Sequence, residues 1–289
     1  MTFDPSRLAA CFALTSNAQG KRFLDVSHPI VSARIAFEGA HLLQCTPTGQ
    51  APLLWVSPDD PQLPGKSLRG GIPLCWPWFG GDRSTSAHGI ARRAPWQLSA
   101  AAESEQGVYL RFDLPAKYIS EQLPGEPWQV YVEFRLGVAI DVQLTTTNLG
   151  QQPMKLSQAL HTYLPVRDIH QARIGGLANA AYIDALDDWT HKTQTGDVQF
   201  ASELDRIYYG HAGDLQLHDA DCPVVVERQG SESVVVWNPW QAKSLRLSEF
   251  PADGYLNMLC IEAANAGPDT RVLEPGQSHT LGTLIRRAG

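Results

Sequence analysis

The stretch WQVYVEFRLGVAIDVQLTTTN, residues 128–148, decides the fold class because apolar and polar side chains alternate along nearly all of it. Alternation with a period of two places one apolar face against a core and leaves the other face partly in water, as in a half-buried β-strand. A second alternating run begins at Val138, so Gly137 is expected to form a tight turn between two antiparallel strands. The segment therefore predicts a β-hairpin.

Shorter runs of the same kind recur along the chain, at residues 30–37, 52–56, 108–114, 223–228, 233–238 and 279–285. Amphipathic helical spacing is scarce, and we expect only one or two helical turns within residues 4–14. Many strands, few short helices and no βαβ rhythm predict an all-β fold, a large antiparallel β-sandwich. No internal repeat, low-complexity linker or charge block marks a boundary, so residues 1–289 are expected to form a single domain.

The chain has 289 residues and a formal net charge of 23 − 30 = −7, which argues against nucleic acid and anionic membranes as partners. Its five cysteines are an odd number without a CxxC pair, which argues against a disulfide framework and a cysteine-rich zinc site. No run approaches the ~18 apolar residues of a membrane span. LAAC at residues 8–11 resembles a lipoprotein cleavage box, but no apolar leader region precedes it, so we interpret the match as chance. A cytoplasmic protein with reduced thiols is expected.

Several reaction classes lack their sequence signatures in this chain. It contains no HExxH motif, no Walker A loop, no nucleophile elbow and no GxGxxG after a strand. Its nine histidines show no metal-ligand spacing. We therefore expect no metal and no cofactor, and general acid–base chemistry is the class that remains.

One glutamate is expected to lie within a buried strand. The stretch YLNMLCIEAAN, residues 255–265, places Met258, Cys260 and Glu262 on one strand face and Leu259 and Ile261 on the other. Because both faces are largely apolar, a central strand is expected, with Glu262 at its end. Loss of hydration would raise the pKa of Glu262 toward the range useful for a general base. The alternative is a structural glutamate that pairs with an arginine or caps a turn.

A histidine occupies a similar setting in LSQALHTYLPV, residues 156–166. His161 is expected to share its strand face with Ala159 and Tyr163, while Leu160 and Leu164 point the other way. The alternative is a hydrogen-bonded structural histidine without a catalytic role.

Three further segments combine polar groups with irregular backbone. The stretch GKSLRGGIPLCWPWFGG, residues 65–81, suits neither a regular strand nor a helix, because its glycines and prolines favour unusual backbone angles; Arg69 stands within it. Residues 86–96, SAHGIARRAPW, carry His88 and Arg92, and residues 203–210 carry Asp205. A solvated surface loop is the alternative for the basic segment. Arginines, aromatic rings and titratable groups together suit a carbohydrate ligand.

The sequence resembles the aldose 1-epimerase-like family, and most of all its hexose-6-phosphate mutarotase branch. Six segments occur in the family's order, over residues 65–265: KSLRGGIPLCWPWFG, AHGIARRAPW, ALHTYLPV, DRIYYG, VVWNPW and LCIEAAN. The first two are the most specific for that branch. The resemblance implies a galactose-mutarotase-like β-supersandwich with a sugar cleft across one concave sheet. It also implies an isomerase that interconverts the α and β anomers of glucose 6-phosphate or a similar hexose 6-phosphate.

The same resemblance implies roles for individual residues. His161 would be the general acid and Glu262 the general base. Arg69, His88 and Asp205 would bind the sugar. Arg92 would join Arg69 near the phosphate.

Two further expectations concern the aromatic residues of the glycine-rich segment and the pH dependence of activity. Trp76, Trp78 and Phe79 would wall the cleft or pack behind it, and core packing is favoured for each tryptophan. The carboxylate of Glu262 is expected to help keep His161 protonated, so that Glu262 governs the acid limb of the pH profile and His161 the alkaline limb.

Three alternatives stay open at the level of sequence. The first is a mutarotase for neutral aldoses, which would need polar groups other than arginines near C6. The second is a non-catalytic carbohydrate or sugar-phosphate-binding protein on the same fold. The third is a glycosidase that uses Asp205 and Glu262 as its carboxylate pair. In each case the partner is a small molecule, and a monomer is expected.

Overall fold

The computed structural model describes residues 8–81, 83, 86–219 and 223–288. Strands dominate these residues, and every strand pairing among them is antiparallel. The described helices are short: α1 (Ala116–Gln122), α2 (Trp240–Ser244) and the 3₁₀ turns Ala91–Arg93, Gly254–Asn257 and Gly267–Asp269. None of the helices in this part of the chain has the length and apolar character needed to cross a membrane. The predicted all-β antiparallel sandwich is confirmed.

The hairpin predicted from residues 128–148 lies inside the larger of two main sheets. In spatial order this nine-stranded sheet consists of β16 (Val198–Gln199), β13 (Arg173–Gly175), β18 (Leu215–His218), β19 (Val224–Gln229), β23 (Ser278–Arg287), β9 (Ile140–Asn148), β8 (Trp128–Leu136), β7 (Gly107–Asp113) and β6 (Gln97–Ser104). Strands β8 and β9 pair from Trp128 opposite Asn148 to Leu136 opposite Ile140. Val138, expected on the apolar face, lies in the turn instead and is 66% exposed.

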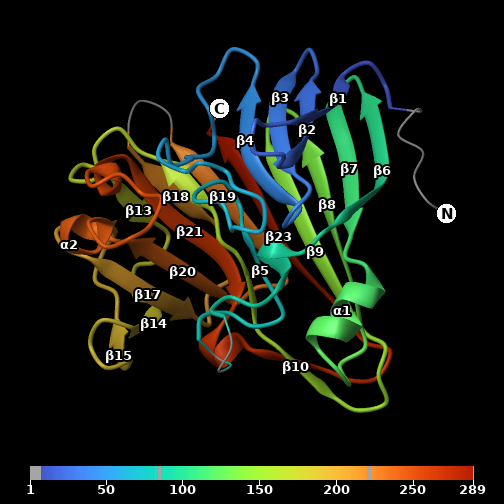
Figure 1. The fold of residues 1–289 in the computed structure, drawn as a ribbon. Helices are drawn as coiled ribbons and strands as arrows, with labels where there is room; N and C mark the ends of the chain where they lie inside the picture. Colours follow the sequence, from blue (N-terminus) through green and yellow to red (C-terminus); the bar gives the residue numbers. More distant parts are fainter. Residues whose placement is uncertain (1–7, 82, 84–85, 220–222, 289) are drawn as a thin grey trace.

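The second main sheet has eight strands and carries most of the segments singled out for chemistry. Its order is β15 (Thr190–Thr193), β14 (Ala181–Asp184), β17 (Leu204–Tyr209), β20 (Ser233–Asn238), β21 (Met258–Asn265), β11 (Gln158–Leu160) and β5 (Leu74–Cys75), with β12 (Tyr163–Pro165) also paired to β21. Figure 1 shows β20 and β21 on one side of the molecule and β6, β7, β8 and β9 on the other.

Two small sheets complete the fold. One contains β1 (Phe12–Ser16), β2 (Arg22–Ser27), β3 (Val31–Ala36) and β4 (His41–Pro47); the other pairs β10 (Met154–Leu156) with β22 (Arg271–Leu273). The four described cysteines are all buried and free, as reduced thiols require, and Cys222 lies outside the described residues.

Strand β21 shows how the two main sheets share a core. Its residues Leu259 and Ile261 belong to the same buried cluster as Val142 and Leu144 of β9, so this face of β21 packs against the nine-stranded sheet. Cys260 and Glu262 lie on the opposite face, as the alternation predicted. Burial on both faces makes β21 the central strand that its nearly continuous apolar sequence indicated.

Two predicted elements are wrong. Residues 52–56 form no strand, because Leu53, Trp55 and Val56 pair with three different segments, at Cys45, Tyr163 and Gly70. The described part of residues 4–14 forms no helix: after a short turn, Phe12 begins β1 and pairs opposite Val26 of β2. Pairing in a sheet outweighs weak helical propensity there.

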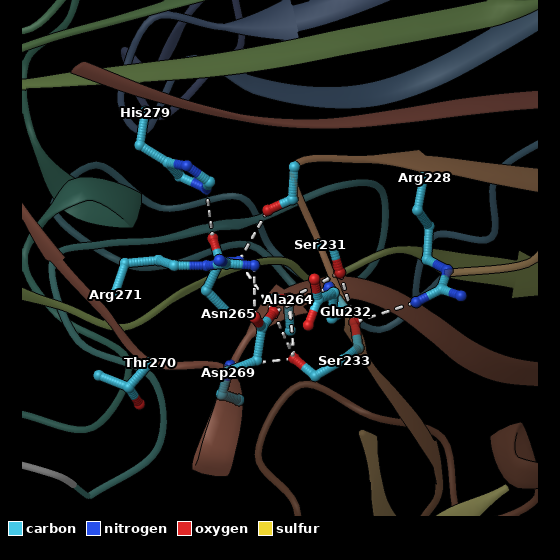
Figure 2. A network of polar contacts seen from close by, with 12 residues as sticks. Arg228, Ser231, Glu232, Ser233, Ala264, Asn265, Asp269, Thr270, Arg271 and His279 are labelled. Carbon is cyan, nitrogen blue, oxygen red and sulfur yellow. Dashed lines mark hydrogen bonds and ion pairs between the residues drawn. The ribbon is translucent and has the colours of Figure 1, made fainter. Parts of the chain in front are cut away.

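A buried polar network holds the C-terminal end of β21, and Asn265 is at its centre (Figure 2). The Asn265 amide Nδ2 donates to the carbonyl of Gly230, at 2.8 Å, and to Asp269 Oδ2, at 2.9 Å. Gln158 Nε2 donates to Asn265 Oδ1 at 3.0 Å, and His279 Nε2 lies 3.0 Å from the same oxygen. Because Gln158 and Asn265 are directly opposite in the β11–β21 pairing, their side-chain bond reinforces the register of these strands.

We expect Asn265→Ala to lower the free energy of unfolding by about 3 kcal/mol, because it leaves buried polar partners without hydrogen bonds. Asn257→Ala is the matched control, since the exposed side chain of Asn257 makes one bond within the described residues, to the carbonyl of Arg167 at 3.2 Å. It should cost less than about 1 kcal/mol. Urea denaturation measures both values, and equal losses would show that the network does not stabilise β21.

Candidate functional site

A cavity of about 580 Å³ lies over the face of the eight-stranded sheet that points away from the shared core. All six residues that the sequence singled out line it: Arg69, His88, Arg92, His161, Asp205 and Glu262. They come from five separate strands or loops, and the fold brings them together. Phe79 also lines the cavity, whereas Trp76 and Trp78 are buried in the core, as expected for the tryptophans.

Strand register places His161 beside Glu262. Strand β11 pairs with β21 up to Leu160 opposite Ala263, and β12 resumes the pairing with Tyr163 opposite Cys260. The register is the same on both sides of the gap, so His161 stands across from Glu262. His161 Nε2 and Glu262 Oε1 are 3.4 Å apart. Glu262 therefore lies in the middle of its strand, and the expectation that it ends the strand is wrong, because pairing with β20 and β11 continues through Ala264.

Burial decides the protonation of the His161–Glu262 pair. It raises the pKa of the Glu262 carboxyl well above its usual range, and the nearby charge of Asp205 adds to this effect. Burial also lowers the pKa of His161 well below its usual value, helped by His88, Arg92 and Arg69. Both shifts place the proton that the two groups share on Glu262 and leave His161 uncharged. The expectation that Glu262 keeps His161 charged is wrong, because desolvation and the cavity's cations outweigh the carboxylate.

Aromatic rings hold the His161 imidazole in place. Tyr163 stacks on it, with ring centroids 5.0 Å apart and planes 13° from parallel. Trp237 and His88 meet it edge to face, at centroid distances of 6.1 and 5.6 Å. Contacts on several sides leave the imidazole little freedom to rotate. A proton donor or acceptor needs such a fixed orientation. Tyr163 and Trp237 were missed by sequence reasoning as site residues, although both stand in segments that it quoted.

The glycine-rich segment before β5 brings Arg69 into the cavity. Gly71, with φ of +63°, is forced to be glycine because a Cβ there would lie 2.2 Å from the carbonyl oxygen of Leu42. This close approach threads the chain between two other segments and leaves Arg69 at the cavity wall, where its guanidinium interacts with Tyr163. Arg69 Nη2 also lies 3.4 Å from the carbonyl of Ser248.

Arg92 approaches the same cavity from the 3₁₀ turn Ala91–Arg93. Its Nη2 donates to the carbonyl of Ala87 at 2.8 Å, while its Nε is buried without a hydrogen-bond partner among the described residues. A buried donor without a partner is uncommon and points to a ligand acceptor. Lys66 and Arg93 also line the cavity and were not predicted as site residues, although each stands within three residues of one that was.

His88 has a left-handed backbone with φ of +62°, and the following Gly89 passes so close to the carbonyl of Trp76 that no Cβ would fit there. The amide of Gly80 donates to His88 Nδ1 at 3.3 Å, so Nδ1 is an acceptor and the ring proton is on Nε2. Burial, followed by the charges of Arg92 and Arg69, lowers the pKa of His88 to about 4. His88 is therefore neutral at pH 7 and presents an N–H donor.

Asp205 contributes from β17, on the other side of Glu262 from His161 in the strand order. Burial raises its pKa to about 6, although Lys243, whose Nζ lies 4.0 Å from Asp205 Oδ2, opposes the shift. At pH 7 Asp205 is largely ionised and can accept hydrogen bonds from hydroxyl groups.

Three potential metal ligands meet in the cavity floor, although their sequence spacing gave no sign of it. His161, Cys260 and Glu262 each place one ligand atom within 4.8 Å of the others. A nitrogen, a sulfur and an oxygen donor would suit an ion such as zinc if the thiol were ionised. Burial, followed by the charge of Glu262, raises the pKa of the Cys260 thiol well above its usual range, which opposes that ionisation.

Comparison with known proteins agrees with this geometry. The family model described as aldose 1-epimerase matches residues 23–286. A protein of Escherichia coli strain K12 named "Putative glucose-6-phosphate 1-epimerase" is 33% identical over 276 residues, which cover 91% of this chain and 89% of that protein. A protein of the same name from Cenchrus ciliaris is 34% identical over 240 residues, 78% of this chain and 72% of that protein.

A solved structure is similar over nearly its whole length. The crystal structure of a protein from Salmonella typhimurium, described as "a putative mutarotase", has a TM-score of 0.89 at 30% identity and covers 98% of this chain and 95% of that one. The family match extends over most of the chain and includes every residue that lines the cavity. This protein belongs to the aldose 1-epimerase family.

Proposed function

We propose that this protein interconverts the α and β anomers of a hexose 6-phosphate, with glucose 6-phosphate as its substrate. One observation carries the proposal: His161 and Glu262, 3.4 Å apart, lie in the same cavity as Arg69 and Arg92. A proton-carrying pair suits ring opening, and clustered arginines suit a phosphate in a protein whose net charge is −7. The names of the relatives from Escherichia coli and Cenchrus ciliaris support the same substrate.

Ring opening needs two proton transfers, and ring closure needs two more that return the enzyme to its starting state. The Glu262 carboxylate takes the proton from the anomeric hydroxyl O1 while protonated His161 gives a proton to the ring oxygen. The bond between C1 and the ring oxygen breaks, and an aldehyde forms at C1. After rotation about the C1–C2 bond, the C5 hydroxyl attacks the other face of the aldehyde, with the two residues in reversed roles.

The substrate's phosphate would also prepare the pair for this reaction. Arg69 and Arg92 help to lower the pKa of His161 while they are unpaired. A phosphate dianion bound between them neutralises their charge, so the pKa of His161 rises when the substrate is bound. The shared proton then moves from Glu262 to His161, and this transfer creates the base and the acid that ring opening requires.

The alternatives account for less of the geometry. A mutarotase for neutral aldoses has no use for the arginines at the cavity wall. A glycosidase that uses Asp205 and Glu262 leaves the His161–Glu262 contact without a role, and a binding protein needs neither proton carrier. We further propose that the protein acts as a monomer in the cytoplasm.

The first test replaces the proton carriers. Glu262→Gln and His161→Asn should each reduce kcat for glucose 6-phosphate by at least ~10²-fold, because a positioned acid or base contributes about that much. NMR exchange spectroscopy between the two anomers measures the rate, and binding of the sugar phosphate should persist as the control. The double mutant should be little worse than the poorer single mutant, because the two residues act as a unit. A folded single mutant with near-normal exchange would remove that residue from the mechanism.

The pH profile of kcat/KM should be bell-shaped, since the active pair holds a single proton. The pKa of His161 is lowered, so adding a second proton at low pH gives the acid limb; the pKa of Glu262 is raised, so losing the last proton gives the alkaline limb. Rate measurements in a series of buffers of constant ionic strength test this. A profile without an alkaline limb would contradict the shared-proton assignment.

The arginines should act on both binding and turnover. Arg69→Ala and Arg92→Ala should each weaken glucose 6-phosphate turnover, as kcat/KM, by ~1–3 kcal/mol, the range for hydrogen bonds to charged groups. Turnover of glucose should suffer less. Added phosphite dianion should accelerate glucose turnover in the wild type but not in Arg92→Ala. Equal losses on both substrates would place these arginines away from the phosphate.

Prolonged EDTA treatment should leave activity unchanged, because the two proton transfers need no Lewis acid and the pKa of the Cys260 thiol opposes metal binding. The measurement compares the activity of the untreated protein with its activity after EDTA treatment and removal of the chelator. A loss that a divalent ion restores would show that His161, Cys260 and Glu262 hold a working metal.

A further inference from the structure

The hairpin between β14 and β15 has an unusual residue at its tip. The amide of Thr190 donates to the carbonyl of Asp187 at 2.9 Å, and the two residues between them, Asp188 and Trp189, have φ of +45° and +59°. Positive φ at both central positions is the pattern of a type I′ turn, for which Asp-Gly is a preferred pair. Trp189 stands where glycine would be preferred, so its backbone conformation costs free energy.

This turn is held by several contacts, so its conformation is imposed and is not the result of a loose loop. Asp187 Oδ2 accepts from Thr190 Oγ1 at 3.1 Å and from Lys192 Nζ at 2.7 Å. Lys192 also pairs with Asp184 Oδ2 at 2.8 Å. The amide of Ala185 donates to the carbonyl of Asp205, at 3.0 Å, which ties the hairpin to a strand of the cavity floor. Such strain persists mainly where the surrounding structure enforces it, and it concentrates at functional sites.

The indole of Trp189 is not explained by core packing. It is 61% exposed, whereas the other tryptophans are buried or partly buried. Within the described residues it makes no hydrogen bond or ring contact, and yet it lines the cavity that contains His161 and Glu262. An exposed aromatic face beside a polar cavity is suited to a ligand that has an apolar surface of its own.

The strand order places Trp189 at the opposite end of the cavity from the arginines. The sheet runs β15, β14, β17, β20, β21, β11, β5, with Trp189 directly before β15 and Arg69 a few residues before β5. His161 and Glu262 lie between these ends. A hexose 6-phosphate with its phosphate on Arg69 and Arg92 and its C1 at Glu262 would extend its remaining ring carbons toward Asp205 and Trp189.

We propose that Trp189 is a substrate-binding residue that stacks on the C–H face of the pyranose ring at the end of the cavity remote from the phosphate. The proposal rests on the function proposed above, because it takes a hexose 6-phosphate as the ligand. Hydroxyl groups that point from this part of the ring toward the indole would disturb the stacking. Trp189 would thereby help to select among hexose 6-phosphates that differ at these carbons, while the arginines recognise the phosphate that all of them share.

Calorimetric titration of the intact protein with glucose 6-phosphate and, separately, with inorganic phosphate tests the proposal. Trp189→Ala should weaken glucose 6-phosphate binding about threefold to tenfold, the range expected for loss of an aromatic stacking contact. Affinity for inorganic phosphate should stay unchanged, because the arginines are intact. Trp189→Phe should retain most of the sugar-phosphate affinity. The KM for anomer exchange should rise with the dissociation constant, while kcat changes by less than about threefold.

Two further variants separate binding from folding. Trp189→Gly introduces the preferred Asp-Gly pair, so the melting temperature of this variant should equal or exceed that of the wild type. Its affinity for glucose 6-phosphate should fall as in Trp189→Ala. Leu186→Ala is the matched control, because Leu186 is exposed on the same hairpin but does not line the cavity; it should bind like the wild type. Unchanged affinity in Trp189→Ala, or an equal loss for inorganic phosphate, would overturn the proposal. A wild type that binds glucose 6-phosphate without turning it over would refute only the proposed catalysis.

Discussion

The pairing register between β11, β12 and β21 is the constraint on which the site depends. It sets His161 across from Glu262, on the face of the sheet that points away from the shared core. A slip of one residue would turn Glu262 into the apolar core and bring Ile261 to the cavity. The Gln158–Asn265 bond lies three pairs away and belongs to the same register, so the buried network at the end of β21 also supports the geometry of the His161–Glu262 pair.

Burial shifts the pKa values of the His161–Glu262 pair and also lowers the stability of the fold, because it leaves polar atoms of the pair without hydrogen bonds to the described residues. Desolvation raises the pKa of Glu262 and lowers that of His161, and both shifts favour a pair that holds one proton. Glu262 Oε2 and His161 Nδ1 are buried without hydrogen-bond partners among the described residues, an arrangement that a protein selected only for stability would avoid. Arg69 and Arg92 add positive charge beside His161 and further disfavour its protonated form.

Some residues that line the cavity depart from ordinary local backbone structure. His88 and Trp189 both have left-handed backbones, one beside the His161 ring and the other at the far rim. At the end of β21, the buried amide of Asn265 has four hydrogen-bond partners. Strained backbone therefore occurs at the cavity, and a fully bonded amide at the end of the strand that carries Glu262.

The sequence by itself determined the all-β antiparallel fold, the faces of the strands that contain His161 and Glu262, and, through the family resemblance, six of the residues that line the cavity. These follow from period-two alternation and from short motifs, which are local properties. The irregular course of residues 52–56, the central position of Glu262 in its strand, the uncharged state of His161 and the place of Trp189 at the rim were decided by the tertiary structure. Each depends on groups that are distant in sequence: strand partners that set the register, and cations and burial that set a pKa. The alternation of side chains in one segment carries no information about which distant segments will surround it.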